Sequence, residues 1–193
     1  MKIFKKRPMG FGEGVEPVPK WGILVPHTEK AQGAVTTEGQ TEYDYGVRLA
    51  VNFYNAGIPI ANRNNGLKKG FKELRKQGVT ASLEPHFNSF NGRAKGAEIL
   101  VLKGDTRSYR IAELCLEILD DSDEFYPDKD DNPRRIRGVK EVAKGDRGYK
   151  NLKAAKDSGM DIALLSELFF GDNYFDYMSE EMQYKFWREA LNI

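Results

Sequence analysis

Histidine is rare in this sequence, and both of its copies follow short apolar runs. His27 ends ILVPH and His86 ends SLEPH, and the 193 residues contain no other histidine. Glu42 opens a helical pattern after the loop that follows His27, Glu84 lies two residues before His86, and Glu167 ends the run IALLSE. Zinc accepts two imidazoles and a carboxylate as ligands, and a further carboxylate nearby can act as general base. The sequence therefore raises the hypothesis of a hydrolytic zinc site.

The spacing alone leaves a structural alternative open. The candidate ligands lie far apart and match no compact signature such as HExxH. A histidine at the end of a strand can also be a structural residue whose ring nitrogens are hydrogen-bonded. Glu167 would then be a buried carboxylate that needs a cationic partner, for which Arg63 and Arg137 are the candidates.

Apolar runs alternate with helical patterns along the chain. The runs predict strands at 21–27, 58–63, 79–86, 96–104, 134–142 and 160–170, and the patterns predict helices at 42–57, 64–78, 106–121, 149–159 and 179–191. This alternation predicts a single α/β domain with a mostly parallel central sheet flanked by helices. Ligands gather at the carboxyl ends of the strands in such sheets, which is where His27 and His86 fall.

Two segments and one cysteine are assigned roles outside the hypothetical zinc site. Residues 1–20 are rich in Lys, Gly and Pro and predict an N-terminal arm or tail before a domain at 21–193. The acidic stretch 121–133 predicts a solvated loop that could gate a cleft. Cys115, the only cysteine, falls on the apolar face of a helical pattern, which favours core packing over catalysis.

The composition limits the classes of partner that the protein is expected to bind. Thirty basic and 29 acidic residues give a net charge of +1, which disfavours nucleic acid as a partner. No apolar run approaches the roughly 20 residues of a transmembrane helix, and the basic start lacks the apolar segment of a signal peptide. Nothing in the sequence indicates an oligomeric state.

Seven segments carry a likeness to a known family. In chain order they are ILVPHTEKAQGAV, EYDYGVRLA, IPIANR, LEPHFN, GAEILVL, RGVK (137–140) and SELFFGDN. Together they resemble the zinc-dependent N-acetylmuramoyl-L-alanine amidases, the catalytic modules of bacterial autolysins and phage endolysins, over roughly residues 21–191.

The resemblance implies a function and a site. The expected reaction is hydrolysis of the amide between the lactyl group of N-acetylmuramic acid and L-alanine, in peptidoglycan or a muropeptide. The implied cofactor is one Zn²⁺ per chain, held by His27, Glu42 and His86, with Glu167 as the catalytic residue. Asn88, Asn173 and Arg63 are weaker candidates for substrate contact.

The chain also departs from the family pattern. LVPHTE lacks the glycines that flank the family's first histidine, Glu84 stands where the family has serine, and Phe169 replaces a glycine. Glu38 is the alternative to Glu42 as a ligand. The alternative functions are a non-catalytic module that binds wall peptide or a partner, and a zinc amide hydrolase of another small peptide.

Without a signal peptide, two settings fit. One is a phage lysin held in the host cytoplasm until release, and the other is a bacterial enzyme exported by another route or kept inside to recycle wall fragments.

Overall fold

A computed structural model describes residues 18–122 and 136–193 of the chain. The strands are β1 (Trp21–Leu24), β2 (Ile60–Ala61), β3 (Ala81–Asn88), β4 (Ala97–Leu102), β5 (Ile136–Val142) and β6 (Ile162–Phe170). The helices are α1 (Glu42–Asn55), α2 (Leu67–Lys76), α3 (Thr106–Asp120), α4 (Tyr149–Asp157) and α5 (Glu180–Leu191). Each corresponds to a predicted element. The N-terminal arm, apart from its last three residues, and nearly all of the acidic loop lie outside the described residues.

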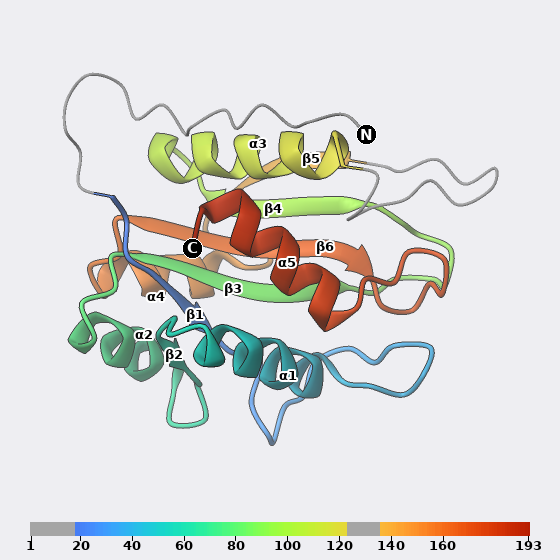
Figure 1. Ribbon diagram of the computed structural model, residues 1–193, viewed down its shortest axis with the longest axis horizontal. Coiled ribbons are helices and arrows are strands. Elements are labelled where there is room, and N and C mark those ends of the chain that lie inside the picture. The colour runs from blue at the N-terminus through green and yellow to red at the C-terminus, as the bar shows by residue number, and fades with distance from the viewer. Residues whose placement is uncertain (1–17, 123–135) are drawn as a thin grey trace.

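One six-stranded sheet organises the fold, in the order β2-β1-β3-β6-β4-β5 (Figure 1). The pairs β2–β1, β1–β3, β3–β6 and β4–β5 are parallel, and β4 pairs with β6 antiparallel. The prediction of a mostly parallel α/β sheet is therefore confirmed. The last strand of the chain, β6, lies between β3 and β4, which follow each other in sequence.

The helices form two layers, one on each face of the sheet. One apolar cluster joins the sheet to α1, α3 and α5, and includes Tyr45, Cys115 and Trp187. A second cluster joins the other face to α2 and α4 through residues such as Leu74 and Leu152. Cys115 is fully buried, as the core prediction requires.

Local signals explain where the helices begin and end. Thr41 Oγ1 accepts a hydrogen bond from the Asp44 amide and caps α1. Ser179 does the same for α5 through the amide of Met182, as its sequence position predicts. Gly57 follows α1 with a φ of +78°, a left-handed conformation that glycine adopts without steric cost.

Strand β3 carries polar residues at alternate positions. Every residue of β3 is buried, and its side chains alternate between Ala81, Leu83 and Phe87 in the first apolar cluster and polar groups on the opposite face. Those polar groups are Ser82, Glu84, His86 and Asn88. No helix in the described part of the chain is both long and apolar enough to cross a membrane.

Candidate metal centre

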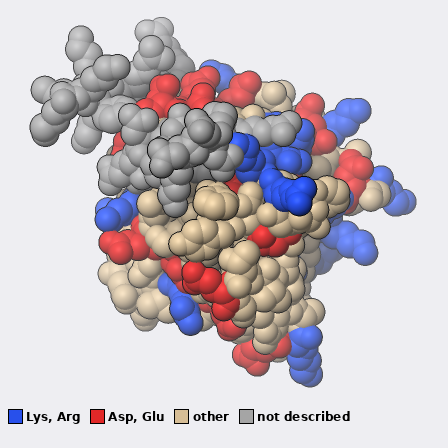
Figure 2. All heavy atoms as spheres, turned by 90° about the vertical axis from the view of Figure 1, so that its right-hand side faces the viewer, with Lys and Arg blue, Asp and Glu red and all other residues tan. Residues whose placement is uncertain are grey.

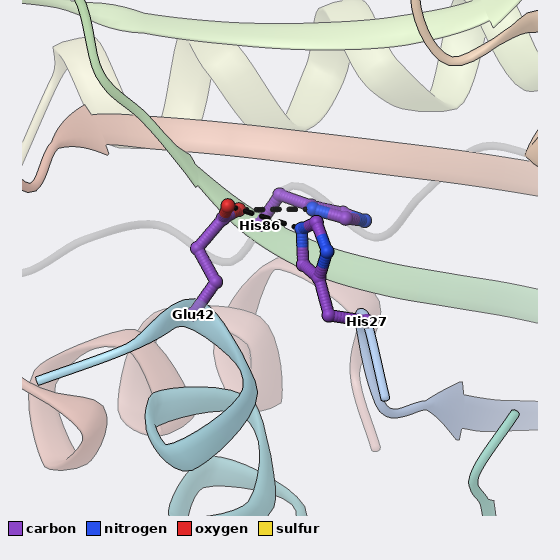
Figure 3. A group of neighbouring side chains, drawn as sticks. All are labelled: His27, Glu42 and His86. Carbon is purple, nitrogen blue, oxygen red and sulfur yellow. Dashed lines mark hydrogen bonds and ion pairs between the residues drawn. The ribbon is translucent and has the colours of Figure 1, made fainter. Parts of the chain in front are cut away.

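Three side chains from separate elements converge on one point. His27 follows β1, Glu42 is the first residue of α1, and His86 lies in β3. Glu42 Oε2 lies 3.0 Å from His27 Nε2, and Glu42 Oε1 lies 3.0 Å from His86 Nδ1 (Figure 3). One ligand atom from each residue lies within 4.8 Å of the other two. The two imidazole rings meet edge to face, with their centroids 4.9 Å apart.

The loop between β1 and α1 is shaped to bring these atoms together. His27 has a φ of +59°, which is uncommon for a residue with a side chain and turns the chain away from β1. Gly33 passes so close that an added Cβ would lie 2.5 Å from Glu42 Oε2 and 2.6 Å from His27 Nε2. The Ala34 amide donates to Glu42 Oε2 at 2.7 Å. The backbone therefore orients the carboxylate before any metal binds.

The charges of this group suit a divalent cation. Burial would raise the pKa of Glu42, but its hydrogen bonds with His27 and His86 hold the pKa well below the usual range. Burial would lower the pKa of His86, but Glu42 and Glu84 outweigh it and raise the pKa to about 9. A cation among these atoms would replace a proton on His86, and two nitrogens with one carboxylate match the donor set of zinc.

A second carboxylate contacts His86 from the other side. Glu84 Oε1 lies 3.2 Å from His86 Nε2, and Arg63 Nη1 and Asn151 Nδ2 donate to the same oxygen at 2.7 and 2.8 Å. Burial would raise the pKa of Glu84, but His86 and Arg63 lower it overall. Arg63 also donates through Nε to the backbone oxygen of His27, at 3.1 Å.

A row across three strands places two more carboxylates beside the histidines. In the sheet register His86 of β3 pairs with Glu167 of β6, and Glu167 pairs with Glu98 of β4. Asn88 Nδ2 donates to Glu98 at 3.1 Å and to Glu167 at 3.2 Å. Arg147 Nη2 donates to the same two carboxyls, at 2.9 and 2.5 Å. Glu98 and Glu167 therefore share two donors.

The two carboxyls titrate differently because one has more cationic support. Burial raises the pKa of Glu167 to about 7, with Glu98 adding to the rise and Arg147 opposing it. Burial would also raise the pKa of Glu98, but hydrogen bonds from Arg137 (Nε–Oε2, 2.8 Å) and from the carboxyl of Glu167 lower it. Of the two carboxyls, Glu167 therefore has the higher pKa and Glu98 the lower.

The structure corrects the expected partner of Glu167. Sequence reasoning offered Arg63 or Arg137, but Arg63 binds Glu84 and Arg137 binds Glu98, and Arg147 contacts Glu167. Arg147 opens RGYK, which repeats the Arg-Gly-x-Lys pattern of 137–140 with one substitution. The repeated pattern was the signal in the sequence that could have pointed to Arg147. Distance along the sequence could not show which of its two arginines contacts Glu167.

The remaining candidates from the sequence, Glu38 and Asn173, lie in loops. Glu38 is exposed in the loop, whereas Glu42 contacts both histidines. Asn173 Nδ2 donates to the Ala94 backbone oxygen and its Oδ1 accepts from the Phe175 amide, so it braces two loops. Sequence reasoning assigned no role to Glu98, Arg147 or Asn151.

Figure 2 views the side toward which β3 and β6 point in Figure 1. Acidic and basic side chains both appear there, among patches of uncharged residues. The exposed face at this end of the sheet is thus neither uniformly basic nor wholly apolar.

Comparison with known proteins identifies the fold. No protein-family model and no curated protein sequence matches the chain. Three of the similar solved structures are the catalytic domain of the CD27L endolysin targeting Clostridia difficile, the amidase AmiC2 of Nostoc punctiforme, and the catalytic domain of the amidase CwlV from Bacillus (Paenibacillus) polymyxa var. colistinus. They share 22, 20 and 15% sequence identity with the chain, at TM-scores of 0.63, 0.60 and 0.61. The alignments cover 90, 89 and 89% of this chain and 97, 92 and 93% of theirs. The fold is that of the N-acetylmuramoyl-L-alanine amidases, as the resemblance of the motifs implied.

Proposed function

We propose that this chain is a zinc-dependent N-acetylmuramoyl-L-alanine amidase. Its reaction would be hydrolysis of the amide between the lactyl group of N-acetylmuramic acid and L-alanine, in peptidoglycan or a muropeptide. One observation carries the proposal: His27, Glu42 and His86 converge while Glu167 lies beside His86 in the sheet register. The amidase fold of the structural neighbours supports it.

His27, Glu42 and His86 would hold one zinc ion per chain. Three protein ligands are typical of catalytic zinc, which keeps a further position open, whereas structural zinc takes four. When bound, zinc supplies a Lewis acid that acidifies water and polarises the amide carbonyl.

Glu167 would move the proton that the reaction requires. The attacking water forms the new C–O bond and gives a proton to the Glu167 carboxylate, which then delivers it to the departing nitrogen as the C–N bond breaks. The products are a lactyl carboxylate and the free amino group of L-alanine. A pKa near 7 suits a group that must both accept and donate a proton at neutral pH. Arg147 and Asn88 would hold the carboxyl in place through their hydrogen bonds to Oε2.

The decisive experiment measures zinc content and bond cleavage together. Purified chain is analysed for bound metal and incubated with peptidoglycan, and newly released L-alanine amino termini are quantified with and without a chelator. We expect one zinc per chain and chelator-sensitive release. Glu167→Gln should keep its zinc and lose about 10²–10⁴-fold in kcat, whereas Glu113→Gln, an exposed change on α3, should behave as wild type.

Other outcomes would select a different function. Wall binding without released amino termini would favour the non-catalytic module. Cleavage of small acyl peptides without action on peptidoglycan or muropeptides would favour a zinc hydrolase of another substrate.

A further inference from the structure

Glu84 is a buried carboxylate to which the proposed reaction assigns no task. Only 2% of its surface is exposed. It lies two residues before His86 in β3, so both side chains project from the same face of the sheet. Burying an ionised carboxylate is costly unless partners compensate for the lost water. All the contacts described above, from Arg63, Asn151 and His86, meet at one oxygen, Oε1.

The two ring nitrogens of His86 face two different carboxylates. Nδ1 faces Glu42 within the proposed zinc ligands, and Nε2 faces Glu84. An ionised carboxylate only accepts hydrogen bonds, so the Glu84 contact requires a hydrogen on Nε2. A neutral imidazole carries one ring hydrogen, and placing it on Nε2 leaves the lone pair on Nδ1. That lone pair is directed toward Glu42 and His27.

We propose that Glu84 is a positioning residue that holds His86 in the Nε2–H tautomer and so presents Nδ1 to the metal. The inference rests on the zinc site of the proposed function. Metal-ligating histidines commonly donate their second nitrogen to a carboxylate, which fixes the ring and makes the ligand more basic. At this position the amidase pattern has serine, so the arrangement is a feature of this chain.

Arg63 extends the support to the second histidine. Its Nη1 donates to Glu84, and its Nε donates to the backbone oxygen of His27. One side chain therefore ties the β1–α1 loop to the carboxylate that orients His86. Asn151 adds a contact from α4, on the second face of the sheet. These donors hold the Glu84 carboxylate in position whether or not His86 is on a metal.

The main competing explanation is that Glu84 only neutralises the buried charge of Arg63. Two variants separate the explanations. Glu84→Gln removes the negative charge with almost no change of shape. The double variant Glu84→Met with Arg63→Met removes both charges together, so neither is left uncompensated and we expect the fold to be retained. It also removes the contact of Arg63 with the His27 backbone, so its deciding readout is the Nε2 proton signal of His86 rather than zinc affinity. Glu73→Gln, an exposed change on α2, is the control.

The readouts are zinc affinity and the state of the imidazoles. Zinc dissociation constants come from competition with a chromogenic chelator. Nitrogen-15 labelling of histidine reports ring protonation directly, and two histidines give only two sets of ring signals. Zinc-loaded wild type should show one ring with a slowly exchanging, hydrogen-bonded Nε2 proton. Both Glu84 variants should weaken zinc binding by about 10–100-fold and change or lose that proton signal.

The outcomes are distinct from those of the hydrolysis assay. Zinc constants within twofold of wild type, with the same imidazole signals, would overturn the role of Glu84. Wild type that binds zinc without cleaving peptidoglycan would refute the proposed reaction, and the Glu84 inference would stand if its variants still weakened zinc binding. Wild type that binds no zinc would overturn both.

Discussion

Replacing Gly33 by alanine should damage the metal site far more than the fold. Gly33 has a φ of +81°, in the left-handed region that costs other residues about 1–2 kcal/mol. The new Cβ would also lie 2.5 Å from Glu42 Oε2 and 2.6 Å from His27 Nε2. Both atoms belong to the proposed ligand set, so relief of the clash must move ligands.

The size of that movement sets the expected loss. Ordinary contact begins at 3.4 Å, so each atom must retreat by roughly 0.8–0.9 Å. Distances in metal sites tolerate about 0.2 Å, which is roughly a quarter of that movement. Loss of a supporting contact alone costs about 10–100-fold in affinity. Because a ligand itself is displaced here, we expect the zinc dissociation constant to rise by about 100-fold or more.

Gly39→Ala is the matched control for this prediction. Gly39 lies in the same loop with a φ of +84°, and its added Cβ would meet nothing within 4 Å. Urea unfolding with chelator present should show a similar loss of stability in both variants, about 1–2 kcal/mol. Chelator competition should then find weakened zinc binding only in Gly33→Ala. Equal zinc affinities in the two variants would refute the reasoning.

Three further predictions concern charge and capping. Glu98→Gln should lower the pKa of Glu167 from about 7 in the zinc-free protein, because it removes a neighbouring negative charge. Carbon-13 NMR of the glutamate carboxyls reports this pKa, and an unchanged titration would contradict the pairing of β4 with β6. In the presence of a metal chelator, the free energy of unfolding should fall as pH rises from 6.5 to 9. His86 keeps its proton in the native state up to a pKa of about 9, whereas histidine in the unfolded chain loses its proton near pH 6.5. The fall should be on the order of 3 kcal/mol between about pH 6 and pH 10 by urea unfolding, and a flat profile would argue against the buried Glu42–His86 ion pair. Ser179→Ala should cost about 1 kcal/mol by thermal unfolding, because the Met182 amide loses its cap, and a thermal midpoint equal to that of wild type would dismiss the capping role.

The sequence was sufficient for the elements and for the candidate ligands. Strand and helix patterns are local: alternation and 3.6-residue periodicity can be read without knowing what packs where. The helix caps at Thr41 and Ser179 are equally local, since the capped amides lie three residues away. His27 and His86 could be singled out because they are the two histidines of the sequence. The order of the motifs that resemble the amidase family then added Glu42 and Glu167 to the candidate site residues.

Only the tertiary structure decided which charged groups meet. Glu98 lies beside Glu167 because β6 inserts antiparallel to β4, between two strands that follow each other in sequence. The position of β5 at the sheet edge decided whether the arginine of RGVK or that of RGYK reaches Glu167. Glu84 acquired its role through contacts with Arg63 and Asn151, 21 and 67 residues away. Strand order and register arise from the packing of both helix layers at once, so no local pattern in the sequence encodes these pairings.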